Sequence, residues 1–514
     1  MLEQIIGPLQ ASSTKILCLF AVVWLSWIVV TTLVAYNTLQ HIPGPPLAAF
    51  TNWWWIKAAI SGKGHLALKY ACDRYGMKVS HEGSIARISP HMVVTSDLEL
   101  YRKANAHRIN DYSRGPWYKA FKMDAERENL FTELNDEKHS LMRAKLSPGY
   151  SGKDNPQCEP SINQMVMDVV HLIQRKYLSV RSNIKPLDWA ELAQYFTLDV
   201  ITYLSLGEAF GFVSDDTDKY AYVKSMEDNF PIMNIFSAVP LLSSIARIPT
   251  VQANLIPSPK EKTGLGKVKA VARQIIASRF SGEKAERYDM VTSFKNHGLS
   301  QLEISDESLF QLLAGSDTTA TIVRTGFLSI LTHPHIYRKL QAEAVATDVP
   351  LETIISHAQA LRLPYLQACI KEALRHHPAA AGLLPRVVGP QGDTHDGVYL
   401  PPGTEVAFCA WNMHRHNTEV YGADAQIFRP ERWLEASPER LAVMEEAHHL
   451  VFGNGRFRCM GENIARLELN KIFFEMIRRF DWSLIDVVNP IKKNMNYGLF
   501  VQKGMFVRVS ELEN

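Results

Sequence analysis

One cysteine has the surroundings of a metal ligand. Cys459 follows a glycine-rich turn and precedes a long amphipathic segment in the sequence FGNGRFRCMGENIA. Free N–H groups and the positive dipole end at the start of a helix favour a thiolate over a thiol, and a soft metal ligand requires a thiolate. Gly453, Gly455 and Gly461 would let the backbone pass close to a bulky flat group, because they have no Cβ. Taken alone, the motif also fits a buried, inert cysteine after a turn.

Three charged residues upstream form a candidate charge triad. Glu372 and Arg375 stand three apart on one face of a predicted helix, in the sequence KEALRHHP, in the order that favours an ion pair. The later sequence FRPERW supplies Arg432 as a third partner. Such pairs usually lie on a protein surface. A buried triad would instead fix geometry, and the loss of one member would cost several kcal/mol.

Polar residues also interrupt an otherwise apolar helical segment. The sequence LLAGSDTTA places Gly315, Asp317, Thr318 and Thr319 in the middle of it, although helix propensity disfavours all four there. A threonine hydroxyl can bond a preceding carbonyl and open the helix locally, which is frequent at functional sites. The apolar flanks predict burial on nearly every side, so a solvent-facing polar patch is the weaker interpretation.

The elements that position these motifs are mostly helical. Apolar residues recur at three-to-four spacing in four segments, 267–280, 305–332, 364–377 and 462–480. Strand-like runs are few, namely 85–94 with an interruption at Pro90, 397–408 and 504–509. The chain beyond residue 50 has no fixed-period repeat, no low-complexity block and no long linker. Residues 51–514 are therefore predicted to form one large unit, mainly α with a minor β part.

The N-terminal part differs in character. After a short segment, 1–15, about 20 residues without a charge at 16–36 are long enough to cross ~30 Å of hydrocarbon, which predicts a transmembrane anchor. A cleaved signal peptide is the alternative, but the apolar part exceeds the usual ~7–15 residues and no clear cleavage site closes it. The sequence HIPGPP then predicts a stiff, proline-rich linker over 37–50. The flanking charges are too few to orient the span.

Composition excludes several classes of protein. The formal net charge is only +2 and charged residues make up 21% of the chain, so a nucleic-acid partner is not expected. The six cysteines include no C-x-x-C pair, which argues against a structural zinc site and a disulfide scaffold and favours a reducing compartment. The chain has no G-x-G-x-x-G fingerprint after a strand and no flavin module. Any electrons that it uses must come from a separate protein.

Together, these blocks resemble the cytochrome P-450 superfamily of haem-thiolate proteins. The resemblance runs from the apolar span and the PGPP linker through AGSDT, EALR and PER to FGNG and CMG, and it covers essentially the whole chain. Each block is weak alone, but the blocks in this order are specific. The surroundings of Arg386, 421–433 and 470–480 also resemble filamentous-fungal members, including the pisatin-demethylase-like branch.

The resemblance implies a cytochrome P-450 fold, with a single large haem domain behind an N-terminal transmembrane helix, and haem b (iron protoporphyrin IX) as the cofactor. Cys459 would be the axial ligand of the haem iron. Phe452, Gly455 and Gly461 would complete the cofactor-binding loop. The triad of Glu372, Arg375 and Arg432 would be structural.

The chain departs from the family pattern next to the cysteine. The family usually has an arginine two residues before the cysteine, where it reaches a haem propionate, and here that residue is Phe457. Arg143 is therefore expected to contact the propionates, together with His139, which replaces the usual aromatic residue four positions earlier. Whether Arg456 or Arg458, which flank Phe457, takes the same role stays open.

The resemblance also implies a function. Thr318 and Asp317 would hold and relay the protons that oxygen activation needs. The enzyme would be a monooxygenase that uses O2 to hydroxylate, epoxidise or O-demethylate a hydrophobic small molecule, within fungal secondary-metabolite biosynthesis. Electrons would come from NADPH through NADPH-cytochrome P-450 reductase, with cytochrome b5 as a further candidate donor. The expected location is the endoplasmic reticulum membrane, with the catalytic domain facing the cytosol.

Substrate and electron-donor contacts follow from the same resemblance. The regions expected to touch the substrate are mostly apolar or aromatic: 112–121, the helix near Ala314, 379–384 and 497–500. A basic face beside the cysteine loop could dock an acidic reductase, with the candidates Lys138, Arg143, Lys145, Arg456 and Arg458.

Two alternatives remain. One is a haem-thiolate isomerase or dehydratase that needs no reductase, and the intact pair of Asp317 and Thr318 speaks against it. The other is a non-catalytic haem-binding membrane protein, which would need neither a proton relay nor a deep apolar pocket.

Overall fold

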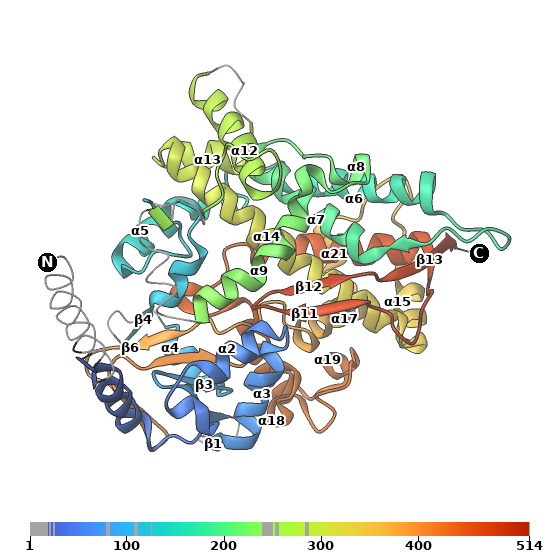
Figure 1. The fold of residues 1–514 in the computed structure, drawn as a ribbon. Coiled ribbons are helices and arrows are strands. Elements are labelled where there is room, and N and C mark those ends of the chain that lie inside the picture. The colour runs from blue at the N-terminus through green and yellow to red at the C-terminus, as the bar shows by residue number, and fades with distance from the viewer. Residues whose placement is uncertain are drawn as a thin grey trace, which may run out of the picture.

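The computed structural model describes residues 19, 22–23, 26–78, 83–106, 111–124, 126–238, 250–251, 256–282 and 287–512. Helices outweigh strands in this part of the chain, so the predicted fold class, mainly α with a minor β part, is confirmed. In Figure 1 the long helices fill the upper and central part of the molecule, and the larger sheet lies below them on the N-terminal side.

The four helices predicted from apolar spacing are all present, with ends within a few residues of the prediction. They are α12 (Gly264–Phe280), α14 (Gln301–Leu331), α17 (Pro364–His376) and α21 (Glu462–Arg479). The other described α-helices of about two turns or more are α2 (Trp53–Ile60), α3 (Gly64–Tyr75), α4 (Leu98–Ala104), α5 (Asp136–Tyr150), α6 (Cys158–Leu172), α7 (Trp189–Leu206), α9 (Tyr222–Ala238), α13 (Met290–Asn296), α15 (Pro334–Val345) and α20 (Pro438–His449). Short helices are α8 (Phe212–Asp215), α16 (His357–Ala360), α18 (Thr418–Tyr421) and α19 (Arg432–Glu435).

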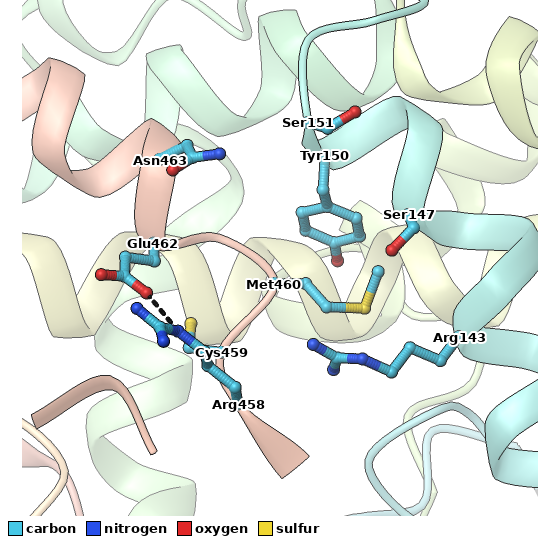
Figure 2. A pocket seen from close by; sticks show the side chains of 9 residues that line it. All are labelled: Arg143, Ser147, Tyr150, Ser151, Arg458, Cys459, Met460, Glu462 and Asn463. Carbon is cyan, nitrogen blue, oxygen red and sulfur yellow. Dashed lines mark hydrogen bonds and ion pairs between the residues drawn. The ribbon is translucent and has the colours of Figure 1, made fainter. Parts of the chain in front are cut away.

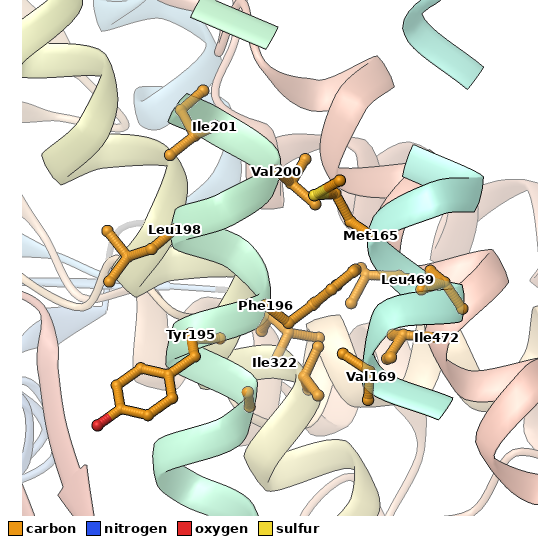
Figure 3. Close-up of a cluster of buried hydrophobic side chains, with 14 of the residues drawn as sticks. Met165, Val169, Tyr195, Phe196, Leu198, Val200, Ile201, Ile322, Leu469 and Ile472 are labelled. Carbon is orange, nitrogen blue, oxygen red and sulfur yellow. The ribbon is translucent and has the colours of Figure 1, made fainter. Parts of the chain in front are cut away.

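α14 runs through the centre of the helical part. A capping box starts it, because the Ser300 hydroxyl accepts the Glu303 N–H and the Glu303 carboxylate accepts the Ser300 N–H at 2.8 Å. It ends just before His333 and Pro334, where a following proline disfavours helical geometry. The helix packs against α7, α12, α17 and α21. Figure 3 shows the apolar contacts around α7, with side chains from α6, α14 and α21.

The strands form one mixed sheet and three small antiparallel sheets. The mixed sheet has the order β1 (Met77–Lys78), β2 (Ser84–Ser89), β3 (Met92–Thr95), β9 (Glu405–Phe408), β6 (Arg386–Val388) and β4 (Tyr112–Arg114), and only β3 and β9 are parallel among its described pairs. The small sheets join β10 (Phe480–Leu484), β13 (Phe506–Glu511) and β5 (Leu187–Asp188); β11 (Lys493–Asn496) and β12 (Phe500–Lys503); and β7 (Asp393–His395) and β8 (Val398–Leu400).

The sequence prediction was wrong about one strand. The run 397–408 is not continuous, because a turn after Leu400 separates β8 from β9 and the two strands enter different sheets. Pro401 and Pro402 have no N–H to donate to a ladder, and Gly403 is left-handed with φ 80°. The interruption of 85–94 at Pro90 was correct, since β2 and β3 form a hairpin around it.

Part of the predicted membrane span, 16–36, lies outside the described residues, namely 16–18, 20–21 and 24–25. Among the residues that are described, no helix is both long and apolar enough to cross a membrane. The linker after the span packs against the large sheet, where the Pro43 carbonyl accepts the Arg87 N–H at 2.8 Å and Ile42 is fully buried. A Cβ on Gly44 would collide with the backbone of Arg87, so only glycine allows this close approach.

Candidate active site

Cys459 lies in the loop that leads into α21. Its N–H donates to the Phe452 carbonyl at 2.7 Å, which closes the glycine-rich turn. Gly453 and Gly455 have φ values of 84° and 55°, and a Cβ on Gly455 would meet the backbone that follows α4, so both positions need glycine. Gly461 is not constrained in this way, because a Cβ there would reach the Cys459 sulfur at 3.9 Å, an ordinary contact.

The cysteine loop borders a cavity of about 340 Å³. The residues that line it are Arg143, Ser147, Tyr150, Ser151, Arg458, Cys459, Met460, Glu462 and Asn463. In Figure 2, Arg143 and Tyr150 extend from α5 on one side, and Cys459 lies on the other beside the ion pair of Arg458 and Glu462 at 2.8 Å. The cavity explains why Cys459 is accessible although the protein surrounds its thiol.

Two opposing effects act on the Cys459 thiol. Burial raises its pKa, while hydrogen bonds from the backbone N–H groups of Gly461 and Glu462 lower it, and the net shift is upward. The N–H groups predicted at the helix entrance are therefore present, but they do not favour the thiolate on their own. A bound metal cation would supply the rest, because a coordinating thiol is deprotonated outright.

Asp317 and Thr318 lie in the middle of α14. The Thr318 hydroxyl donates to the Ala314 carbonyl at 2.8 Å, as predicted, but α14 is a continuous α-helix, so the predicted local opening is absent. Burial raises the pKa of Asp317 to about 7, and the positive charge of Arg324 opposes this shift. Asp317 can therefore give up and take back a proton near neutral pH.

The predicted triad forms a fully buried network. Arg375 binds Glu372 through two hydrogen bonds, from Nη2 to Oε1 at 2.7 Å and from Nε to Oε2 at 2.8 Å, and Arg432 Nε reaches Oε1 at 3.0 Å. The two guanidiniums outweigh the effect of burial and hold the pKa of Glu372 below its ordinary value. Trp433 Nε1 donates to Oε2 at 2.9 Å, a partner that the sequence interpretation missed although it directly follows Arg432.

The triad also anchors the chain that leads toward the cysteine loop. Arg375 Nη1 donates to the carbonyls of His414 and Ala425, at 2.9 and 2.7 Å. Arg432 Nη1 donates to the Tyr421 carbonyl at 2.6 Å. The network therefore ties α17 to the irregular segment between β9 and α20.

Three arginines surround the ring of Phe457. Their guanidinium carbons lie 4.6 Å (Arg114), 4.2 Å (Arg386) and 4.7 Å (Arg456) from its centroid. Register places the first two together, because Arg114 of β4 is directly opposite Arg386 of β6. The buried Nε atoms of all three have no hydrogen-bond partner within the described part of the chain. Burial, with the charges of Arg386 and Arg143, lowers the pKa of Arg114 to about 9.

This cluster answers the open question about the residues that flank Phe457. Arg456 turns inward, is only 6% exposed and pairs with Asp136 at 3.0 Å, so it does not belong to an exposed docking face. Arg458 turns to the other side, toward Glu462. The sequence interpretation missed Arg114 and gave Arg386 no role, because strand register, rather than chain proximity, brings them to Phe457.

His139 lies beside the same cluster on α5. It is 1% exposed, its ring centroid is 5.3 Å from that of Phe457, and neither ring nitrogen has a hydrogen-bond partner among the described residues. Burial lowers its pKa to about 3, and the surrounding arginines add to the shift, so the ring is neutral. Arg143, one turn further along α5, reaches the cavity beside Cys459.

Comparison with known proteins identifies the family. The family model described as cytochrome P-450 matches residues 42–507. The chain belongs to the cytochrome P-450 family. It is 37% identical to the cytochrome P-450 monooxygenase ABA1 of Pyricularia oryzae, over 99% of both chains. It is 33% identical to aba1 of Botryotinia fuckeliana, over 92% of both chains, and 33% identical to abl1 of Leptosphaeria maculans, over 97% of this chain and 88% of the relative. Both are also named cytochrome P-450 monooxygenases.

Membership of the cytochrome P-450 family makes this chain a haem enzyme, an oxidoreductase that incorporates oxygen from O2. The residues present fit haem. Cys459 offers a sulfur that accepts two backbone N–H groups beside a cavity, and the arginines at Phe457 offer unpaired cationic donors that suit the two haem carboxylates. If haem binds here, Arg114, Arg386 and Arg456 would hold its propionates, besides the predicted Arg143 and His139.

We expect Glu372→Gln to lower the free energy of unfolding by about 3–5 kcal/mol, because it leaves two buried guanidiniums without their counter-charge. The control is Glu435→Gln, which breaks an ion pair with Arg429 of 2.8 Å in which the glutamate side chain is 63% exposed, and it should cost less than about 1 kcal/mol. Denaturant unfolding of the haem-loaded proteins measures both. Equal costs would contradict the buried role of the triad.

We expect Arg386→Met to speed the loss of haem by about tenfold or more, since a charge-assisted hydrogen bond is worth about 1.5–3 kcal/mol. The control is Arg87→Met, which removes another buried arginine of the same sheet, with its Nε also unpaired and an aromatic ring at 5.7 Å. Transfer of haem to an excess of apomyoglobin gives both rates. Loss as slow as in the unaltered protein would remove Arg386 from the propionate contacts.

Proposed function

We propose that this protein is a membrane-anchored haem-thiolate monooxygenase. It inserts one oxygen atom from O2 into a hydrophobic small molecule, by hydroxylation, epoxidation or O-demethylation, in fungal secondary-metabolite biosynthesis. NADPH supplies the electrons through a separate reductase. The observation that carries the proposal is the buried carboxyl of Asp317 within the long helix α14, directly followed by the half-buried Thr318; burial raises the pKa of Asp317 to about 7, which suits a proton relay. The fungal relatives named monooxygenases support it.

Haem held by a thiolate activates oxygen, because the sulfur pushes electron density that favours O–O cleavage. The chain itself supplies protons and excludes water. Asp317 holds a proton in the interior, and the Thr318 hydroxyl, which is half-buried one residue further along α14, passes it toward the reacting side. An isomerase or dehydratase has no use for such an acid, and the relatives' names also favour oxygen insertion over a non-catalytic haem protein.

A row of packed aromatic rings near the predicted substrate-contact regions supports the proposal that the substrate is hydrophobic. Phe131 stacks on Phe310 of α14 with centroids 4.9 Å apart, and Phe121 and Trp117 extend the row at 5.6 and 4.8 Å. Three of these four rings lie within or near regions that the family resemblance assigns to substrate contact. Tyr112, in the same predicted region, is instead 2% exposed and donates to Asp393 at 2.6 Å, so its role is structural.

Surface features support the remaining parts of the proposal. Lys138 and Lys145 lie three and four residues from Leu141 on α5, which is 67% exposed, and Arg458 of the cysteine loop is half-exposed, so an acidic electron donor such as the reductase or cytochrome b5 could dock on this side. Large apolar side chains are exposed along the described part of the N-terminal segment, including Val29, Val30, Leu33 and Val34. They favour a membrane anchor. The endoplasmic reticulum as its location, with residues 51–514 on the cytosolic side, is proposed from the family resemblance alone.

The protein should turn over a hydrophobic substrate only with both NADPH and a P-450 reductase, and its reduced carbon-monoxide adduct should show the thiolate-type Soret position. Cys459→Ala should lose that position, whereas Cys158→Ala, at a half-buried cysteine on α6, should keep it. A panel of terpenoid, polyketide, alkaloid and phenolic compounds, first screened for spin-state shifts, supplies the substrates. Turnover without reductase would favour the isomerase alternative.

Thr318→Ala should uncouple electron use from product formation and lower the product formed per NADPH on the order of tenfold, because the proton relay loses its last hydroxyl. The control is Thr325→Ala, two turns further along α14, whose hydroxyl donates to the Thr321 carbonyl at 2.8 Å in the same kind of bond. NADPH consumption and product are measured together. Unchanged coupling in Thr318→Ala would remove that role.

A further inference from the structure

An irregular segment, 126–132, carries one ring of the aromatic row and is held by side chains from other elements. It lies between the 3-10 helix Pro116–Phe121 and α5, and none of its residues belongs to a helix or a strand. Phe131 of this segment stacks on Phe310 of α14, with the ring centroids 4.9 Å apart and the planes 20° apart. Both residues are half-buried, so both keep surface that a ligand can touch.

Two charged side chains clamp the residue before Phe131. Glu307 of α14 accepts the Leu130 N–H at 2.5 Å, and Arg114 of β4 donates from Nη1 to the Leu130 carbonyl at 2.6 Å. Glu307 is only 2% exposed, and burial raises its pKa to about 8. A neutral side chain could bond the same backbone groups at a lower cost, because a charge is expensive to bury. The clamp therefore calls for a role beyond the stability of the fold.

One side of α14 carries the clamp, the stacked ring and the proposed relay hydroxyl. The residues on this side, at spacings of three, four and four, are Glu307, Phe310, Ala314 and Thr318. Residues three and four apart are neighbours on a helix surface. The helix near Ala314 is also one of the regions that the family resemblance assigns to substrate contact. A ring held against Phe310 therefore lies on the side of α14 from which Thr318 acts.

The segment is also fixed from two further directions. The guanidinium carbon of Arg114 lies 5.6 Å from the ring centroid of Phe131 and 4.6 Å from that of Phe457, so the clamp adjoins the arginine cluster. A second carboxylate of α14, Asp306, accepts Arg127 Nε of the same segment at 2.7 Å. These contacts leave the ring of Phe131 little freedom to move away from α14.

We propose that Glu307 is a positioning residue for substrate selection, which holds the Leu130 backbone so that Phe131 forms a fixed wall of the substrate pocket. This deepens the proposed function and rests on it, because the wall lies on the same side of α14 as Thr318. The wall selects ligands with a flat apolar ring, since such a ring gains from packing against a fixed aromatic ring. A small ligand that binds only the haem iron does not reach it.

The test compares two ligands, imidazole and 4-phenylimidazole, in the full-length, haem-loaded protein. Both bind iron through a ring nitrogen, and only the second adds a flat apolar ring. Spectroscopic titration gives their dissociation constants. We expect Glu307→Ala to weaken the binding of 4-phenylimidazole by about tenfold, the effect of one buried hydrogen bond, and to leave that of imidazole unchanged. Glu307→Gln should keep both affinities, because its amide oxygen can accept the same N–H.

The matched control is Glu343→Ala, which removes a carboxylate of α15 that accepts the Tyr365 N–H at 2.9 Å in the same kind of bond. It should leave both dissociation constants unchanged. Equal weakening of the two ligands by Glu307→Ala, or no weakening of either, overturns the inference. Binding by Glu307→Gln that is as weak as that of Glu307→Ala also overturns it, because the acceptor for Leu130 would then not be what matters.

Should Glu307→Ala not retain haem, Glu307→Asp takes its place, since it keeps the charge on a side chain one carbon shorter. It must show the same selective loss, and unchanged binding of 4-phenylimidazole would refute the positioning role. Ligand binding needs neither NADPH nor reductase, so the proposed function fails separately. A selective loss in a protein that oxidises no substrate would leave the wall standing and remove only the oxygen insertion.

Discussion

The exclusion of water from the helical interior determines the chemistry of the candidate active site. Burial is the largest influence on the pKa of Asp317, which it raises to about 7, on that of His139, which it lowers to about 3, and on that of the Cys459 thiol, which it raises. The packing of α14 against α7 and α21 buries Asp317 in this interior. The apolar contacts that stabilise the fold therefore also set the acid strength of the groups inside it.

The interior contains two different arrangements of charged side chains, one fully paired and one with excess positive charge. In the triad, Glu372 meets two guanidiniums and the remaining donors of Arg375 and Arg432 reach backbone carbonyls, so the network is complete without any ligand. Around Phe457 three guanidiniums lie close together, and among the described ion pairs only Arg456 has a carboxylate partner, Asp136. The first arrangement fixes geometry, and the second leaves positive charge for a bound anion to neutralise. Binding of haem should therefore contribute to the stability of the fold, since a ligand that binds only the native state stabilises it.

Local patterns predicted much of this molecule. The C-terminal end of α14, both ends of α21, the pairing of Glu372 with Arg375 and the turn before Cys459 follow from residues close together in the sequence, where periodicity and glycine geometry act. Arg114 and Arg386 are 272 positions apart by their numbering, and only the register of β4 and β6 sets them face to face. The upward shift in the pKa of Cys459 could not be predicted from the sequence, because it depends on the burial of the thiol, which the motif does not reveal.

The phenylalanine before Cys459 fits the arginine cluster better than the usual arginine would. Its ring accepts guanidiniums at 4.2 to 4.7 Å from three directions, and each such contact is worth about 0.5–2 kcal/mol depending on desolvation. An arginine at this position would place a further like charge among three that already have few counter-charges, and burial, with the charges of Arg386 and Arg143, already lowers the pKa of Arg114. Strand register and the inward turn of Arg456 deliver the positive charge that the family usually obtains from this position. Phe457 therefore serves as the apolar support on which that charge is arranged.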